Sequence, residues 1–367
     1  MALAPELVPE LVIVIPTLNE HANVAPLVTL LDQALQGVRW EAVFVDDDST
    51  DGTARTVWDV TRGDPRVRCI QRIGRRGLSS ACIEGALASA APVIAVMDAD
   101  LQHDERILPD MLRLLRQGEH DVVVGSRYVA GGGTGDWAAG RVRISGLATR
   151  LGQALCRTAI ADPMSGFFLI TRTAFEAAVR RLSGQGFKIL LDLLASSPRP
   201  LRVVEVPFTF RTRQHGESKL DTMVAWEFGM LLAEKTVGRF VPVRFALFAA
   251  VGSLGLLLHL GVLRLVLGTT GLSFGEAQSV ATAVAILANF TGNNVLTYRD
   301  KRLRGWRFVR GLLSFYVICG LGAVANVGIA SYAFANQQSW WVAGLAGAGL
   351  GLVWNYAVSS VYTWQRR

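Results

Sequence analysis

The chain has 367 residues, which is long for one domain and comfortable for two. Its hydrophobic fraction of 51% and mean hydropathy of +0.33 are high for a soluble protein. The net charge of +7 comes from residues 241–367, where ten Lys and Arg accompany two acidic residues. The first 240 residues hold 27 basic and 28 acidic residues, so a nucleic-acid partner loses its main support and none is expected.

Strands and helices alternate in the first part of the chain. Apolar runs of strand length occupy residues 11–15, 41–45 and 93–97, and residues 24–35 have helical periodicity. Each run ends in a polar loop, which predicts a doubly wound, mostly parallel α/β sheet. Such sheets bind ligands in the crevice beyond the carboxyl ends of their strands.

The loop after the third run carries the sharpest chemical signal. Asp98 and Asp100 flank one residue, so two carboxylates can converge on Mg²⁺ or Mn²⁺, and Gln102 adds a neutral oxygen at the same spacing. A metal there would neutralise a departing diphosphate. His103 is less suited to these metals, and we interpret it as a neighbour of the ligands or a surface residue. Walker and Gly-x-Gly-x-x-Gly loops are missing from the sequence, which excludes the corresponding ATPase and dinucleotide sites.

Two stretches are amphipathic if they are helical. Residues 137–158 combine bulky apolar side chains, such as Trp137, with four arginines, and residues 221–240 are similar, with Trp226 among their bulky apolar side chains. Both suit helices that lie at the headgroup level of a membrane, and packing against the sheet is the alternative.

Residues 241–367 are almost continuously apolar. Four segments are long enough to span a bilayer, at about 244–267, 277–298, 308–334 and 341–364. The loop 299–310 carries six cations, whereas 268–276 and 335–340 carry none. The positive-inside rule therefore predicts that this loop and both termini are cytoplasmic. The N-terminal residues do not resemble a signal peptide, and the four cysteines show no paired or metal-type spacing, which indicates thiols in a reducing compartment.

The apolar part also resembles a duplicated hairpin. Asn-Phe at 289–290 and Thr-Tyr at 297–298 align with Asn-Tyr at 355–356 and Thr-Trp at 363–364, at an offset of 66. The first helices align Phe245 and Gly252 with Phe315 and Gly322, at an offset of 70. Buried asparagines are costly in lipid, so we expect interhelical hydrogen bonds at Asn289, Asn293, Asn326 and Asn355.

The motifs together resemble family 2 glycosyltransferases, and within them the dolichol-phosphate mannose synthase group. The matching stretches are 15–20, 45–53, 98–103, 125–128, Arg141 with Ser145, 162–168 and 213–219. Asp48 departs from the pattern, since the family usually has Gly or Asn there. Residues 241–367 resemble the GtrA-like membrane family, through Phe-x6-Gly and the two Asn-aromatic repeats.

The resemblance implies an α/β GT-A (Rossmann-like) catalytic domain at 1–220, an interfacial linker at 221–240 and a four-helix transmembrane domain at 241–367. It also implies inverting transfer of one hexose from a nucleotide sugar to a polyprenyl (dolichyl-type) phosphate on the cytoplasmic face. The stretch 162–168 resembles the mannose-transferring branch, which favours GDP-mannose, with UDP-glucose as the alternative.

Site roles follow from the same resemblance. The implied nucleoside ligands are Pro16, Thr17, Glu20, Asp46 and Asp47, and the implied metal and diphosphate ligands are Asp98, Asp100 and Gln102. The acceptor phosphate would meet Arg127, Arg141, Ser145 and Ser218, while Arg213, Ser218 and Lys219 would close over the diphosphate. Chemistry agrees, because a phosphate acceptor is already an anionic nucleophile and needs cations more than a base. Arg143 could replace Arg141 in that role.

Two other functions stay open from the sequence. A processive polysaccharide synthase carries Gln-x-x-Arg-Trp, which occurs here at 36–40 but far upstream of its usual place. A flippase or transporter for lipid-linked sugars would make the first domain regulatory, which the intact set of motifs disfavours.

Overall fold

The computed structural model describes residues 8–133, 155–183, 188–211, 242–335 and 340–364, together with residues 149, 152, 153 and 229. The chain separates into two units, Met1–Thr236 and Val237–Arg367. Most of the two amphipathic stretches predicted at 137–158 and 221–240 lies outside the described residues.

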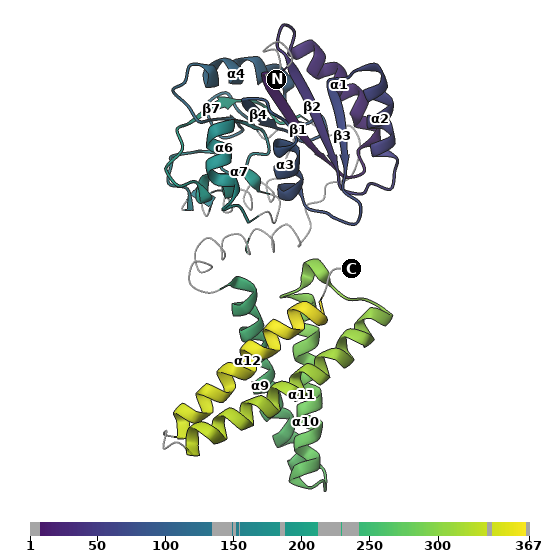
Figure 1. Ribbon diagram of the computed structural model, residues 1–367, viewed down its shortest axis with the longest axis vertical. Helices are drawn as coiled ribbons and strands as arrows, with labels where there is room; N and C mark the ends of the chain where they lie inside the picture. Colours follow the sequence, from purple (N-terminus) through teal and green to yellow (C-terminus); the bar gives the residue numbers. More distant parts are fainter. Residues whose placement is uncertain are drawn as a thin grey trace, which may run out of the picture. The chain divides into compact units, whose positions relative to one another are not determined.

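The first unit is built on a seven-stranded sheet of order β3-β2-β1-β4-β6-β5-β7 (Figure 1). Its strands are β1 (Leu11–Thr17), β2 (Trp40–Asp46), β3 (Val67–Gln71), β4 (Val93–Val96), β5 (Val122–Ser126), β6 (Phe168–Thr171) and β7 (Val203–Pro207). Neighbouring strands run parallel except at β6, which is antiparallel to both β4 and β5. The predicted mostly parallel α/β sheet is confirmed.

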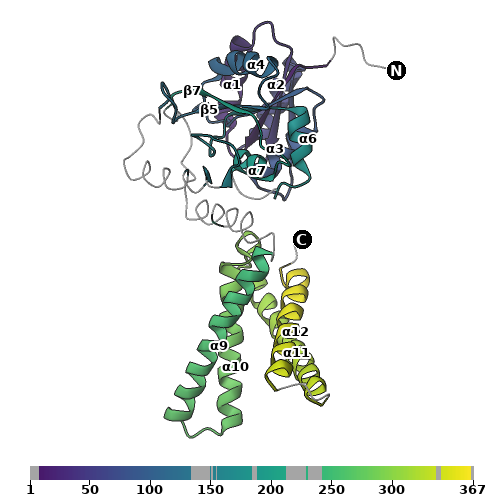
Figure 2. The ribbon, with the colours of Figure 1, turned by 90° about the vertical axis from the view of Figure 1, so that its left-hand side faces the viewer.

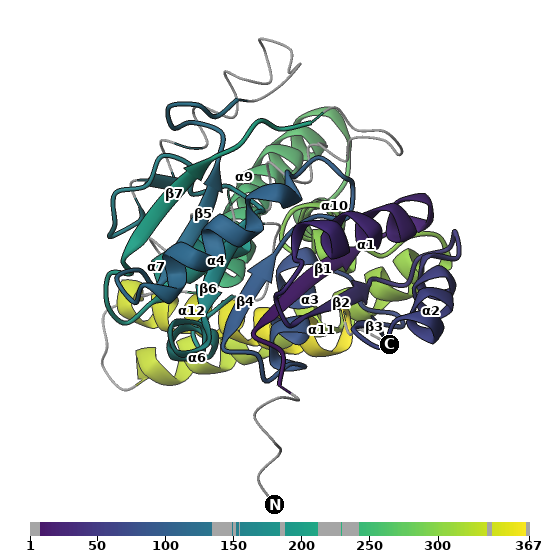
Figure 3. The ribbon, with the colours of Figure 1, turned by 90° about the horizontal axis from the view of Figure 1, so that it is seen from above.

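Helices cover both faces of this sheet (Figure 3). The helices of the first unit are α1 (His21–Ala34), α2 (Thr53–Gly63), α3 (Leu78–Leu87), α4 (Leu108–Arg116), α6 (Arg172–Val179) and α7 (Ile189–Ser196). Alternate residues of β1 point to opposite cores: Ile13 packs in the cluster of α1, α2 and α4, while Val14 packs in that of α3, α6 and α7. Gly85 of α3 permits a close approach, because a Cβ there would lie 2.4 Å from a Val14 methyl group.

The register of the sheet brings the polar loops together. Thr17 at the end of β1 pairs with Asp46 at the end of β2, and Val14 pairs with Val96 near the end of β4. Because β6 is antiparallel, its first residue Phe168 lies beside Val96, so the segment before it reaches the same edge. The carboxyl ends of β1, β2, β4 and β5 and the amino end of β6 therefore share one edge.

The second unit consists of two helical hairpins (Figure 2). One is α9 (Val243–Thr269) with α10 (Phe274–Val295), and the other is α11 (Trp306–Ala335) with α12 (Trp340–Tyr362). A capping box of Ser273 and Glu276 starts α10. Each apolar segment expected from the sequence overlaps one of these helices. Within the described residues, α9 alone has the length and apolar composition to cross a membrane.

The two hairpins repeat each other in detail. Asn289 of α10 packs on Gly255 of α9, and Asn355 of α12 packs on Gly322 of α11. The first helices are therefore related by an offset of 67, and the offset of 70 predicted from Phe245 and Gly252 is wrong. The Phe-x6-Gly spacing occurs twice in α9, three residues apart, and the pattern alone does not distinguish the two registers.

Contacts between the hairpins follow the same repeat. Phe248 meets Tyr356 with ring centroids 5.6 Å apart, and the equivalent pair Phe315 and Phe290 is 5.7 Å apart. Tyr298 and Trp364 occupy equivalent positions and stack on each other at 4.1 Å. Equivalent residues touch in this way only near an axis of two-fold pseudosymmetry, so these rings mark that axis.

Candidate active site

The loops after β1 and β2 are interlocked by hydrogen bonds. The Asn19 N–H donates to Ser49 Oγ at 2.8 Å, and the Thr50 N–H donates to Asn19 Oδ1 at 3.0 Å. The Glu20 N–H donates to Thr53 Oγ1 at 2.9 Å. Asn19 has φ +57°, a left-handed conformation that asparagine tolerates better than most residues. The expected nucleoside loops therefore form one rigid rim.

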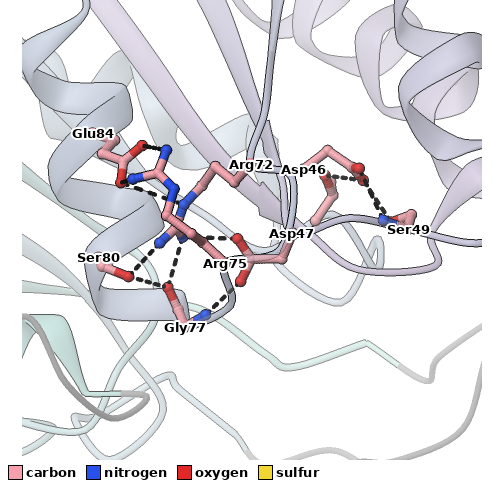
Figure 4. Close-up of polar contacts among 9 residues, drawn as sticks. Asp46, Asp47, Ser49, Arg72, Arg75, Gly77, Ser80 and Glu84 are labelled. Atoms are coloured by element: carbon pink, nitrogen blue, oxygen red, sulfur yellow. Dashed lines mark hydrogen bonds and ion pairs between the residues drawn. The ribbon is translucent and has the colours of Figure 1, made fainter. Parts of the chain in front are cut away.

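Asp46 and Asp47 stabilise this rim from inside (Figure 4). Asp46 is fully buried and accepts hydrogen bonds from Ser49 N at 3.0 Å and from Thr17 Oγ1 at 3.4 Å. Asp47 accepts from the Gly77 N–H at 2.6 Å and from Arg72 Nη1 at 2.7 Å. Burial raises the pKa of the Asp47 carboxyl above its usual range, although the Gly77 and Arg72 bonds oppose the shift.

Arg72 is a residue of this site that sequence reasoning missed. Its guanidinium lies just after β3, is almost fully buried, and also donates to Ser80 Oγ at 2.6 Å and to the Gly77 carbonyl at 3.0 Å. Gly77 has φ +141°, which favours glycine, and begins α3. The signal available in the sequence was an arginine directly after a short strand and five residues before a glycine.

The acidic loop after β4 is held in a strained turn. Leu101 has φ +62°, a conformation that costs a non-glycine residue roughly 1–3 kcal/mol and that clusters at functional sites. The turn directs the Gln102 N–H to Asp100 Oδ1 at 3.1 Å. Gln102 also holds the main chain of Arg211, four residues beyond β7: its side-chain Nε2 donates to the Arg211 carbonyl at 2.9 Å, and its own carbonyl accepts from the Arg211 N–H at 2.9 Å.

The oxygen donors of this loop suit a hard divalent cation. The side chain of Asp98 is 36% exposed, whereas Asp100 is buried. The Gln102 Nε2 bond to Arg211 places Oε1 on the other side of the amide. Among the described residues, no three His, Cys, Asp or Glu side chains gather as a complete metal site. A cation here would need few carboxylates and the oxygens of a bound diphosphate, as Mg²⁺ does in nucleotide sites.

His103 lies behind these donors and is 2% exposed, so its interpretation as a surface residue is wrong. Its ring stacks on Phe167 with centroids 5.0 Å apart, and its Nδ1 accepts from the Asp98 N–H at 3.1 Å. Burial lowers the pKa of His103 to about 4, so the ring is neutral near pH 7. Nδ1 is an acceptor, so the proton sits on Nε2, 3.8 Å from Asp98 Oδ2.

Arg127 follows β5 and forms a two-pronged pair with buried Asp162. Its Nε and Nη2 donate to the two Asp162 oxygens at 2.7 and 2.8 Å. Burial opposes the charge of Arg127, but the Asp162 bonds outweigh it and raise the pKa of the guanidinium further. The Asp162 N–H in turn donates to Glu205 Oε1 of β7 at 2.9 Å. Asp162 thus holds Arg127, and Glu205, which was not expected from the sequence, holds the Asp162 backbone.

The described candidate residues all derive from the shared edge of the sheet. They are Pro16, Thr17, Glu20, Asp46, Asp47, Asp98, Asp100, Gln102 and Arg127. The remaining candidates lie outside the described residues: Arg141, Ser145, Arg213, Ser218 and Lys219.

Comparison with known proteins gives this arrangement a class. Residues 12–178 match glycosyl transferase family 2, and residues 247–364 match the GtrA/DPMS transmembrane domain. The doubly wound sheet and its acidic edge are thus those of a family 2 glycosyltransferase with a GT-A fold. The second match, together with apolar α9, makes the chain a membrane protein.

Curated relatives narrow the class further. The chain is 36% identical over 359 residues to a dolichol-phosphate mannosyltransferase of Pyrococcus furiosus, covering 96% of this chain and 98% of the relative. Enzymes of the same name from Mycosarcoma maydis and Saccharomyces cerevisiae are 39% and 36% identical, over 65% and 64% of this chain and 84% and 90% of the relatives. The chain therefore belongs to the dolichol-phosphate mannosyltransferase family.

A solved structure is also similar to part of the chain. Glucosyl-3-phosphoglycerate synthase from Mycobacterium tuberculosis is 20% identical, with a TM-score of 0.46, over 63% of this chain and 79% of that protein.

Proposed function

We propose that this enzyme transfers one mannose from GDP-mannose to a polyprenyl phosphate with inversion, giving polyprenyl phosphate mannose on the cytoplasmic face of the membrane. The observation that carries the proposal is the junction of the Asp98–Asp100–Gln102 loop with the Asp162-held Arg127 at one edge of the sheet. Such a junction would set a site for an anionic leaving group beside a cation for an anionic acceptor. The Pyrococcus furiosus relative that matches almost the whole chain is named a dolichol-phosphate mannosyltransferase, which supports the same reaction.

On the donor side, the rim of Pro16, Thr17, Glu20, Asp46 and Asp47 would bind the nucleoside. The carboxyls of Asp46 and Asp47 already hold the loop backbone, so their main contribution is the shape of that rim. Asp98, Asp100 and Gln102 would hold Mg²⁺ or Mn²⁺, which supplies charge neutralisation for the departing diphosphate. Arg213 and Lys219 would close over the same diphosphate.

On the acceptor side, Arg127, Arg141, Ser145 and Ser218 would hold the phosphate of the polyprenyl lipid. One phosphate oxygen forms the new bond to the anomeric carbon while the bond to the diphosphate breaks on the opposite face. The diphosphate leaves with the bonding electrons, and the sugar inverts. The acceptor is ionised at neutral pH, so no side chain has to remove a proton, and catalysis is mainly orientation.

The membrane arrangement belongs to the same proposal. The unit at 241–367 would span the bilayer four times with α9, α10, α11 and α12, and residues 221–240 would link it to the catalytic domain at 1–220. The cations of 299–310 support a cytoplasmic position for this loop, and with it for the catalytic domain.

Removal of Asp100 tests the mechanism. Asp100→Ala should lower the rate of mannose transfer more than about 100-fold, because loss of an outer-shell partner alone costs a metal site up to roughly 100-fold in affinity or activity. The assay is transfer from labelled GDP-mannose to polyprenyl phosphate, with Asp110→Ala, an exposed carboxylate on α4, as the control. Unchanged turnover of Asp100→Ala at saturating metal would refute the mechanism. A donor panel on the wild type checks the sugar, and preference for UDP-glucose would replace the mannose assignment.

A further inference from the structure

We propose that the segment 299–310, which joins α10 to α11 and includes residues 306–310 at the start of α11, is a docking surface for the phosphate monoester headgroup of polyprenyl phosphate. The inference rests on the proposed function and gives the membrane domain a role in substrate capture, beyond anchoring.

The segment carries a high and exposed positive charge. Residues 299–310 contain six cations and one acid. Arg302, Arg304, Arg307 and Arg310 are all exposed. None of these four guanidinium groups pairs with a carboxylate whose side chain the structure describes. Like charges held this close repel one another, and an anionic partner removes that repulsion.

The segment is held in a defined shape. Asn294, at the end of α10, is 1% exposed and clamps the Leu303 backbone from both sides, donating from Nδ2 to the carbonyl at 3.1 Å and accepting from the N–H at 2.8 Å. Trp364 Nε1 donates to the same Asn294 Oδ1 at 3.1 Å. The Leu303 side chain packs on Gly311, where a Cβ would lie 2.4 Å from it. The cations are therefore displayed by a loop of defined shape and by the start of α11, which lowers the ordering cost of binding.

Position and chemistry select a lipid phosphate. The segment joins the ends of two helices of the membrane domain, and Trp306, 77% exposed between Arg304 and Arg307, is the aromatic type that settles at headgroup level. Guanidinium groups match phosphate oxygens in two-pronged geometry. A phosphate monoester carries a charge between −1.5 and −2 near neutral pH, by analogy with phosphorylated side chains, against −1 for a phosphodiester, so a surface of four arginines favours it.

The substrate test replaces the four exposed arginines together, as Arg302→Gln, Arg304→Gln, Arg307→Gln and Arg310→Gln. In proteoliposomes of phosphatidylcholine, the KM for polyprenyl phosphate should rise about tenfold or more, because each basic residue near an anionic headgroup contributes to binding. The KM for GDP-mannose and the kcat at saturating acceptor should stay within about twofold, since the surface lies outside the reacting atoms. The control removes four exposed arginines of the first unit, Arg55, Arg62, Arg113 and Arg180, and should leave both KM values unchanged.

A binding test needs no turnover. The purified full chain in detergent is heated with polyprenyl phosphate, phosphatidylglycerol, phosphatidylcholine or inorganic phosphate. Polyprenyl phosphate should raise the melting temperature of the wild type and of the control, and the quadruple loop variant should lose most of that shift. Equal protection by phosphatidylglycerol or by inorganic phosphate, or an unchanged shift in the loop variant, would overturn the proposal. A wild type that is protected but makes no product would instead contradict the proposed function.

Discussion

Two largely buried arginines lie at the candidate site: Arg72 pairs with Asp47 and, at 3.4 Å, with Glu84, and Arg127 pairs with Asp162. Removing one partner of such a pair leaves the other charge buried and costs about 3–5 kcal/mol. Arg127→Ala would therefore weaken the fold as well as any contact to an acceptor. Arg127 cannot be assigned a role from activity loss alone, and nucleotide binding by the same variant has to be measured with it.

His103 is the residue whose effect on the cation is easiest to isolate. His103→Phe keeps the stack on Phe167 but removes the acceptor for the Asp98 N–H, so the Mn²⁺ dissociation constant should rise about 10- to 100-fold, as for other outer-shell partners. His103→Asn keeps an acceptor at the Nδ1 position and removes the stack, so it should bind Mn²⁺ more tightly than His103→Phe. The measurement is Mn²⁺ titration with GDP by electron paramagnetic resonance. Equal affinities at equal melting temperatures would contradict the role.

At the scale of elements, the sequence predicted the strands that are buried apolar runs. The strands at 11–15, 41–45 and 93–97 are found within one or two residues, because each is buried on both faces and therefore apolar throughout. The edge strand β7 is only half-buried, and the reversal at β6 is a property of chain topology that no local pattern records. Arg72 and Glu205 were missed for the same reason, since their roles depend on partners 25 and 43 residues away.

The corrected register of the first membrane helices makes its own prediction. Gly255→Ala should lower the melting temperature of the chain, because its Cβ would lie within contact distance of the Asn289 amide and overpacking costs about 1–3 kcal/mol. Gly252→Ala meets nothing within 4 Å and gains helix propensity, so it should leave the melting temperature unchanged or higher. Unfolding in detergent measures both. The reverse order of the two variants would restore the alignment at an offset of 70.

At the scale of the whole molecule, the distribution of cations predicts one orientation in the membrane. A reporter domain that is active only in the cytoplasm should be active when it is fused after residue 367 or inserted at Gly305, because both positions adjoin arginines. An insertion at Gly271, in a loop without cations, should give the opposite result. A cytoplasmic signal at Gly271 would exclude the four-span arrangement.

The hydrogen bonds of Asn294 to Leu303 are a feature in which the two repeated hairpins differ. The equivalent position in the second hairpin is Ser360, whose hydroxyl bonds within its own helix to the Ala357 carbonyl. Other equivalent positions keep similar side chains, as Asn289 and Asn355 or Phe248 and Phe315 do. If two copies of one hairpin chain formed a symmetric pair, any substitution would appear in both copies at once. After duplication within one gene, Asn294 could specialise to hold the arginine-rich segment while its counterpart kept an ordinary helical role.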